Sequence, residues 1–290
     1  MKIGLVLEGG AVRTVYSCGV TDALLAKDFI ADYVIGTSGG VAYGTSYCSR
    51  QPGRNLEVIK TYANSYKYMS FRNLINPKNK SYFGLDFVYE TIPNELIPFD
   101  YEAFAKFKGD VIATVTDVET GKPDYLKVPR HDKHNTVLKA TCALPMLSPI
   151  IMYHGKGYLD GGISDSIPFK KAFEDGCDKV IVVLTRHKGY IKKQESVLKA
   201  TLTHYRHYPE LCEALISRPD NYNQQVAEAE ALEREGKLFI FRPDNTDGFK
   251  RNEKDLDKIQ ALYDDGYKDV FDRYDELMRF IDSDLPSKGI

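Results

Sequence analysis

Short apolar runs alternate with helical patterns along the first half of the chain. Residues 3–7 form one such run, and a Gly-Gly turn separates it from apolar positions that recur at helical spacing. A second run at 33–35 leads through a glycine-rich turn into a predicted helix over 41–48. Continuous apolar runs at 111–115 and 180–184 are typical of strands buried on both faces. This alternation predicts an α/β fold with a mostly parallel central sheet.

The remaining segments show less regular patterns. Residues 55–105 are rich in Tyr, Phe and Asn, and they form either an insertion that covers a pocket or short helices packed on the edge of the sheet. Residues 195–236 predict helices that break near Pro209 and Pro219, because proline lacks the backbone donor that a helix needs. The apolar spacing over 253–281 predicts a long amphipathic helix.

Composition narrows the class of protein. The chain has 290 residues, 43% of them apolar and 28% charged, as in a globular protein of one or two domains. Lys and Arg number 28 against 23 Asp and Glu over residues 1–218, and 11 against 18 over 219–290, which is too weak a bias to indicate nucleic-acid binding. Five widely spaced cysteines without a CxxC pair predict buried, reduced thiols. With no signal peptide or membrane-length apolar run in evidence, we expect a cytoplasmic location.

Residues 36–40, Gly-Thr-Ser-Gly-Gly, carry the strongest local signal for chemistry. They match the G-x-S-x-G elbow, in which a nucleophilic serine sits on a tight turn between a strand and a helix. The predicted strand before Gly36 and the predicted helix after Gly40 supply that context, and the glycines let the backbone turn sharply. Ser38 is therefore the candidate nucleophile, although Gly-Ser turns also occur in ordinary loops.

A serine hydroxyl needs a base that takes its proton. None of the six histidines lies on an evident strand-end turn, and only about one strand precedes the elbow, so a Ser-His-Asp triad fits poorly. Asp160 fits better, because it ends a short apolar run directly before Gly161 and Gly162, and a carboxylate near Ser38 can act as the base itself. The alternative is an Asp-Gly turn that merely closes a hairpin.

A third candidate element is the segment Glu-Gly-Gly-Ala-Val-Arg at residues 8–13, which follows the first predicted strand and opens a helix. Backbone N–H groups in such a position bind negative charge. They can form an oxyanion hole for acyl transfer or cradle a nucleotide phosphate, or the glycines can be purely structural. The nucleotide alternative lacks both the full G-x-G-x-x-G pattern and the G-K-[ST] ending.

These three elements, in this order, resemble the patatin-like phospholipase family. Its signature combines a Gly-rich oxyanion loop with a basic residue, a G-x-S-x-G nucleophile and a D-G-[GA] base loop, which residues 9–13, 36–40 and 160–162 match. The block Ala-Thr-Cys-Ala-Leu-Pro at 140–145 and the Ile-Pro pair at 167–168 are also similar to the family.

The resemblance implies a three-layer α/β/α patatin-like fold with a mostly parallel central sheet. Residues 1–190 would form the catalytic domain, and residues 191–290 would form a mainly helical C-terminal extension packed on it, with one further strand at 238–241. The implied partner is a lipid or acyl-ester substrate, with membrane contact that is at most peripheral. The implied chemistry requires no metal and no cofactor.

The resemblance also implies a Ser-Asp dyad without histidine. Ser38 would attack an ester carbonyl, and Asp160 would take its proton and later activate the hydrolytic water. The residues implied for the oxyanion hole are Gly9, Gly10, Ala11 and Arg13, and those for the nucleophile elbow are Gly36 and Gly40. The family loop usually has glycine where this chain has Ala11 and Thr14, and alanine at positive φ would cost about 1 kcal/mol.

The expected function is therefore hydrolysis of a phospholipid, lysophospholipid or related lipid ester. The substitutions at Ala11 and Thr14 leave open a catalytically weak or inactive lipid-binding or regulatory protein on the same scaffold. A nucleotide-binding α/β domain is the third alternative.

Overall fold

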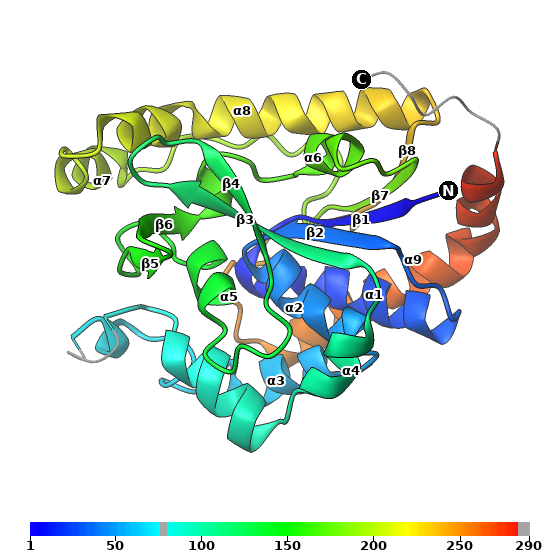
Figure 1. Cartoon of the computed structure of the whole chain (residues 1–290), viewed down its shortest axis with the longest axis horizontal. Helices are drawn as coiled ribbons and strands as arrows, with labels where there is room; N and C mark the ends of the chain where they lie inside the picture. Colours follow the sequence, from blue (N-terminus) through cyan, green and yellow to red (C-terminus); the bar gives the residue numbers. More distant parts are fainter. Residues whose placement is uncertain (76–79, 284–290) are drawn as a thin grey trace.

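A single mixed sheet of eight strands runs through the described residues, which are 1–75 and 80–283 of a computed structural model (Figure 1). The strands are β1 (Ile3–Leu7), β2 (Tyr33–Thr37), β3 (Asp110–Asp117), β4 (Pro123–Lys127), β5 (Ile151–Tyr153), β6 (Lys156–Asp160), β7 (Lys179–Val183) and β8 (Leu238–Phe241). Their order is β5-β6-β3-β2-β1-β7-β8, with β4 also paired to β3. The pairs among β3, β2, β1, β7 and β8 are parallel, whereas β4, β5 and β6 pair antiparallel. The sheet is thus mostly parallel, as the apolar runs predicted.

Helices cover both faces of this sheet (Figure 1). On one face lie α1 (Val15–Ala26), α2 (Gly39–Cys48), α3 (Arg54–Tyr62), α4 (Tyr101–Lys106), α5 (Thr136–Thr141) and α9 (Leu256–Asp282). On the other face lie α6 (Phe169–Glu174) and α8 (Pro209–Arg234), with the short α7 (Leu198–His204) beside the start of α8. This three-layer α/β/α arrangement is the fold class that the sequence predicted.

The central strands are largely apolar because both of their faces are buried. In β1, Leu5 and Leu7 join the core under α1 and α2, whereas Val6 joins the core under α6 and α8. In β7, Ile181 and Val182 divide between the same two cores. A strand between two helical layers needs an apolar side chain at every position, which explains the continuous runs in the sequence.

Residues 191–283 add the edge strand of the same sheet and helices on both of its faces. β8 pairs with β7, while α8 covers one face and α9 the other. The amphipathic pattern over 253–281 is confirmed as α9, which begins after Asp255, whose side chain accepts from the N–H groups of Asp257 and Lys258. The division of the chain near residue 190 stays a prediction.

One expectation about local structure is wrong, and one alternative does not hold. α8 continues through the buried Pro219, and the chain breaks only between α7 and α8, just before Pro209. Proline removes one backbone hydrogen bond, and the packing of the buried face of α8 outweighs that loss. Asp160 does not close a hairpin either, because it ends β6 and leads into a short 3₁₀ turn, and the hairpin turn lies at residues 154–155.

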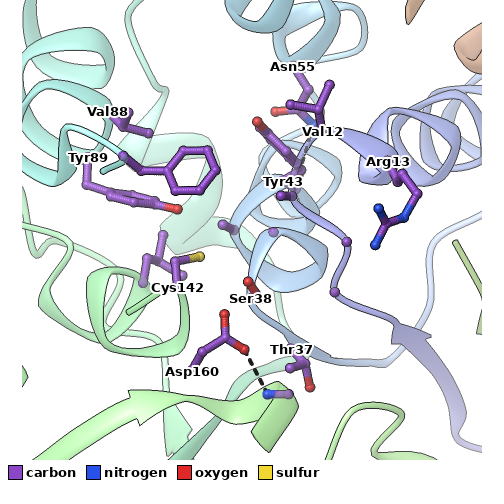
Figure 2. A pocket seen from close by; sticks show the side chains of 18 of the residues that line it. Val12, Arg13, Thr37, Ser38, Tyr43, Asn55, Val88, Tyr89, Cys142 and Asp160 are labelled. Carbon is purple, nitrogen blue, oxygen red and sulfur yellow. Dashed lines mark hydrogen bonds between the residues drawn. The ribbon is translucent and has the colours of Figure 1, made fainter. Parts of the chain in front are cut away.

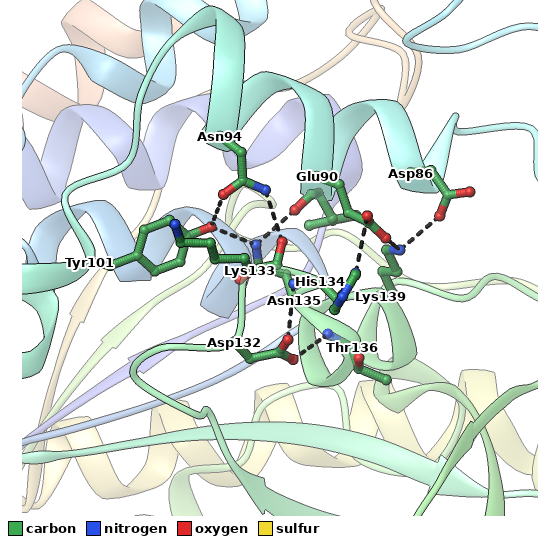
Figure 3. A network of polar contacts seen from close by, with 11 residues as sticks. Asp86, Glu90, Asn94, Tyr101, Asp132, Lys133, His134, Asn135, Thr136 and Lys139 are labelled. Atoms are coloured by element: carbon green, nitrogen blue, oxygen red, sulfur yellow. Dashed lines mark hydrogen bonds and ion pairs between the residues drawn. The ribbon is translucent and has the colours of Figure 1, made fainter.

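The aromatic segment 55–105 includes a π-helix (Phe87–Leu96) that a polar network fastens to α5 (Figure 3). Lys139 on α5 forms ion pairs with Asp86, at 2.7 Å, and with Glu90. The Asn135 side chain, just before α5, donates to a carbonyl of the π-helix at 2.7 Å. These contacts fix the π-helix against the body of the protein.

The longest interface between two helices joins α1 and α9. A Cβ on Gly19 would overlap with the carbonyl oxygen of Tyr263, and a Cβ on Gly266 would overlap with that of Tyr16. Tyr263 also donates its hydroxyl proton to Asp22 at 2.7 Å. The two backbones therefore approach as closely as only glycine permits.

We predict that Gly266→Ala lowers the free energy of unfolding by about 1–3 kcal/mol, because the new methyl group meets backbone that cannot rotate away. The loss is expected although alanine is the better helix former. Chemical denaturation measures it, and Asp275→Ala, on the exposed face of α9, is the control that should change stability by less than about 0.5 kcal/mol. A Gly266→Ala protein as stable as the wild type would contradict this account of the interface.

Candidate active site

Strand register brings the three predicted motifs to one end of the sheet. β1 and β2 are parallel with Leu7 opposite Gly36, so the loop after β1 lies beside the elbow after β2. β6 runs against β3, and its last residue, Asp160, returns to a position opposite Val115, next to the level at which β2 ends. Ser38 and Asp160 consequently face each other across the end of the sheet (Figure 2).

Ser38 sits on a strained turn between β2 and α2. Its φ of 54° and ψ of −134° lie in a region that side-chain-bearing residues rarely adopt. Its backbone N–H donates to the Thr141 hydroxyl at 2.8 Å, and this hydroxyl donates to the Thr114 carbonyl at 2.6 Å. Side chains at Gly36 and Gly40 would overlap with the carbonyl oxygen of Leu7, so the elbow needs glycine on both sides of the serine.

Asp160 presents one unpaired carboxylate oxygen toward Ser38. The residue is 3% exposed, and its Oδ1 accepts from the Gly162 N–H at 2.8 Å. Within the described part of the chain its Oδ2 has no hydrogen-bond partner, and the carboxylate points toward the Ser38 side chain (Figure 2). Burial raises the pKa of Asp160, while the Ser38 hydroxyl and the Gly162 N–H act in the opposite direction.

The glycine loop after β1 offers free backbone donors beside Ser38. Among the residues that the structure describes, the N–H groups of Gly9, Gly10 and Ala11 donate no hydrogen bond. A Cβ on Gly9 would lie 2.9 Å from the Cβ of Ser38, which shows how closely the loop approaches the elbow. Ala11 has a φ of 50°, the positive value at which alanine is strained, and its carbonyl accepts from the Thr14 hydroxyl.

Arg13 lies on the far side of this loop from Asp160 (Figure 2). Burial, followed by the charge of Arg186, lowers the pKa of Arg13 to about 10. Its Nε is buried without a hydrogen-bond partner in the described residues. The loop is held in place next to Arg13 by the Val12 N–H, which donates to the Arg251 carbonyl at 3.0 Å.

Histidine takes no part in this arrangement. None of the six histidines lines the pocket above Ser38, and the ring of His187, for example, pairs with the Thr246 hydroxyl at 2.9 Å. Residues 1–75 and 80–283 contain no group of three or more His, Cys, Asp or Glu side chains placed to hold a metal ion.

The pocket above Ser38 encloses about 1570 Å³ of space between atoms, part of it open to solvent. One side is apolar and is formed largely by the aromatic segment and α5. Its apolar side chains include Val58, Phe83, Leu85, Val88, Ile92, Phe104 and Leu138. The segment therefore lines the pocket as well as packing on the body of the protein, which combines the two alternatives that the sequence left open.

The sequence did not single out several residues that the structure brings to the site. Thr141 belongs to the block at 140–145, but nothing in its spacing indicated that it holds the elbow. The other side of the pocket carries basic side chains that are remote from one another in sequence, Arg186, Lys192, Arg218 and Arg251. Only the topology brings these residues together, so no local pattern marks them.

Fold and site define a class: a three-layer α/β protein with a serine on a strained strand–helix elbow, a buried aspartate facing it and unpaired backbone N–H groups alongside. The chain belongs to the patatin-like phospholipase family, whose model matches residues 5–173. Residues 208–282 match a second family model, described as a domain of unknown function (DUF6363).

Two individual proteins are similar to this chain. The uncharacterized protein YjjU of Escherichia coli (strain K12) is 28% identical over 198 residues, which cover 63% of this chain and 52% of that protein. The chain thus spans about half the length of the curated relative that it matches. The crystal structure of VipD from Legionella pneumophila aligns with 95% of this chain and 67% of its own, at 13% identity and a TM-score of 0.45.

Strain at the elbow can be measured apart from the chemistry. Ser38→Gly and Ser38→Ala both remove the hydroxyl, but glycine alone adopts the backbone angles of residue 38 without strain. We predict that the Ser38→Gly protein is more stable than the Ser38→Ala protein by about 1 kcal/mol in chemical denaturation.

The same pair of substitutions at Ser196 is the control. This exposed serine has no positive φ, so glycine there is expected to be less stable than alanine, because glycine gives the unfolded chain more freedom. Finding alanine more stable than glycine at residue 38 as well would rule out strain at the elbow.

Proposed function

We propose that this protein is a serine acyl-ester hydrolase that acts on phospholipids, lysophospholipids or related lipid esters through Ser38 and Asp160. The observation that carries the proposal is the buried, unpaired Oδ2 of Asp160 facing a serine on a strained elbow at the end of an apolar pocket. A base needs such an unpaired oxygen, and leaving one oxygen of a buried carboxylate without a hydrogen bond costs stability.

In the first half of the proposed reaction, the Ser38 Oγ attacks the ester carbonyl while its proton passes to Asp160 Oδ2. The oxygen that becomes negative would be held by the unpaired N–H groups of Gly10 and Ala11, in a site where each such donor is worth roughly 3–4 kcal/mol. When the intermediate collapses, the alcohol leaves with the proton from Asp160, and the acyl group remains on Ser38.

In the second half, Asp160 takes a proton from a water molecule, which attacks the acyl-enzyme. When the second tetrahedral intermediate collapses, the bond between the acyl carbon and Ser38 Oγ breaks, Asp160 gives the proton to that oxygen, and the fatty acid leaves. Each proton that Asp160 accepts is given back, so the carboxylate and the serine are regenerated. Arg218 donates to the Gly162 carbonyl at 2.6 Å and thereby steadies the loop whose N–H holds Asp160.

The acyl chain would occupy the apolar side of the pocket, beneath the aromatic segment. Phe71 and Ile75 of that segment are 72% and 84% exposed, which suits a peripheral contact with a lipid surface. Among the described residues, no helix has the length and apolar character needed to cross a membrane. A cytoplasmic location remains part of the proposal.

The alternative is a lipid-binding protein with little or no activity, and the positive φ of Ala11 favours it, because strain there can distort the oxyanion loop. Covalent labelling separates the two functions. A fluorophosphonate reacts with an activated serine and leaves an inactive binding protein unlabelled.

We predict that a fluorophosphonate labels the wild-type protein at Ser38 and that Ser38→Ala abolishes both labelling and hydrolysis of p-nitrophenyl esters. Asp160→Asn is expected to slow both reactions by about 10²–10⁴-fold, because the proton acceptor is gone. Ser196→Ala and Asp220→Asn, both at exposed positions, are the matched controls and should react as the wild type does. Equal labelling of Asp160→Asn and wild-type protein would remove Asp160 from the mechanism.

The pH dependence of the reaction follows from the burial of Asp160. Its carboxylate must be ionised to act as a base, and burial raises its pKa, so kcat/KM should fall as the pH drops through a value above the ordinary aspartate pKa of about 3.9. Stability should change in the opposite sense. Because the folded state disfavours the charged form, the contribution of Asp160 to stability is lost as the pH rises through this pKa.

Rate measurements from pH 4 to 8 and denaturation over the same range test both halves of this prediction. The residual kcat/KM of the Asp160→Asn protein should no longer fall at low pH. An unchanged fall of kcat/KM at low pH in this variant would show that a group other than Asp160 titrates.

A further inference from the structure

Six basic side chains line the pocket. Arg54 lies over the ring of Phe99 in the aromatic segment, and we refer to the other five, whose charges act on one another, as the cationic cluster. They come from four parts of the chain: the loop after β1, the segment after β7, α8 and the segment before α9. The cluster consists of Arg13, Arg186, Lys192, Arg218 and Arg251. Figure 2 shows Arg13 on the other side of Ser38 from Val88 and Tyr89.

Nearby carboxylates do not balance the charge of this cluster. Glu8 also lines the pocket, but its two oxygens already accept from the Thr185 N–H and from the Tyr222 hydroxyl. Glu195 pairs with Arg218 at 3.3 Å and with Arg251 at 2.9 Å. Asp160 also lines the pocket and interacts electrostatically with Arg218 and Lys192. Three carboxylates thus face five basic groups, which leaves the pocket wall with a net positive charge.

Two members of the cluster are held without an anionic partner of their own. The Lys192 ammonium has no hydrogen bond or ion pair within the described residues, and burial, followed by Arg218, lowers its pKa to about 7. Arg13 keeps a buried Nε without a partner. A bound anion would satisfy both groups and relieve the repulsion between them.

Aromatic rings in this part of the pocket are already covered by cations. The guanidinium of Arg186 lies 4.1 Å from the ring centroid of Tyr190, and Lys192 Nζ lies 4.7 Å from that of Tyr222. A quaternary ammonium headgroup binds to open aromatic faces, and these two faces are taken. The chemistry of the wall therefore suits a negative group and disfavours a choline.

The cluster also lies next to the proposed reaction centre. Arg218 donates to the Gly162 carbonyl, and the Gly162 N–H donates to Asp160. An ester with its carbonyl at Ser38 and its acyl chain on the apolar side would extend its remaining part toward the basic side chains.

We propose that the cationic cluster is a subsite for the phosphate of a lipid headgroup, and that the substrate is a glycerolipid whose headgroup has a net negative charge. The proposal rests on the proposed function, since it requires the ester at Ser38. It also gives a role to the segment of unknown function, because Arg218, Tyr222 and Arg251 lie within residues 208–282.

The test measures binding in the Ser38→Ala protein, where no hydrolysis interferes. Three lipids with the same oleoyl chain are compared below their micelle concentrations: lysophosphatidic acid, lysophosphatidylcholine and monooleoylglycerol. We expect lysophosphatidic acid to bind at least tenfold more tightly than the other two, and its advantage to shrink as salt is raised. Similar affinities for all three lipids would overturn the proposal.

Substitutions locate the effect. Arg186→Gln and Lys192→Gln, singly and together in the Ser38→Ala protein, should reduce the preference for lysophosphatidic acid, with at least a tenfold loss for the pair. Lys188→Gln and Lys193→Gln remove exposed charges from the same segment but outside the pocket, and the preference should survive them. Thermal melts show that each variant is folded. An equal loss in the two sets would mean that overall charge, and not this subsite, attracts the lipid.

The last experiment measures competition by glycerol 3-phosphate, because this molecule carries the phosphate without the acyl chain. We expect it to compete only weakly with lysophosphatidic acid, and equal competition would mean that a water-soluble phosphate ester is the ligand. Failure of wild-type protein to hydrolyse any lipid would count against the proposed function alone, since these measurements need no turnover.

Discussion

The hydrogen bond from the Ser38 N–H to the Thr141 hydroxyl fixes the geometry on which the site depends. The Thr141 hydroxyl in turn donates to the Thr114 carbonyl of β3, so the two hydrogen bonds join the elbow to that strand. The chain therefore enforces backbone angles at Ser38 that it would not adopt alone. The same contact places the end of α5 relative to the elbow, and α5 carries the Lys139 ion pairs that hold the π-helix on the apolar side of the pocket. One buried bond thus links Ser38, the sheet and the apolar side of the pocket.

Some features of the site could be predicted from the sequence because they depend on residues that are close together in the chain. The elbow was predictable, since its strand, glycine turn and helix follow one another within a few residues. Asp160 was predictable because two glycines follow it directly. The sequence predicted strain at Ala11 if its φ is positive. The φ of Ala11 is 50°, so this strain is present. These features depend on neighbours in the chain, which is the information that a sequence pattern contains.

The rest depends on packing between distant segments. Pro219 breaks a helix by local rules, but α8 buries Leu215 and Tyr222 on either side of it, and burial outweighs one lost backbone bond. The cationic cluster is another case. Arg13 and Arg251 are far apart in sequence, and they meet only because the Val12 N–H binds the Arg251 carbonyl. No spacing rule could identify such a group.

The C-terminal segment is part of the site as well as of the scaffold. α9 packs on α1 through a glycine on each helix, and α1 follows the glycine loop that comes after β1. α8 reaches the opposite flank, where Arg218 donates to the Gly162 carbonyl in the turn after β6. The two flanks of the Ser38–Asp160 pair are therefore each supported by a helix from the last hundred residues. Burying the several basic side chains of the cationic cluster lowers the stability of the protein unless an anion offsets their repulsion. A role in binding an anion therefore explains the cluster better than a purely structural role.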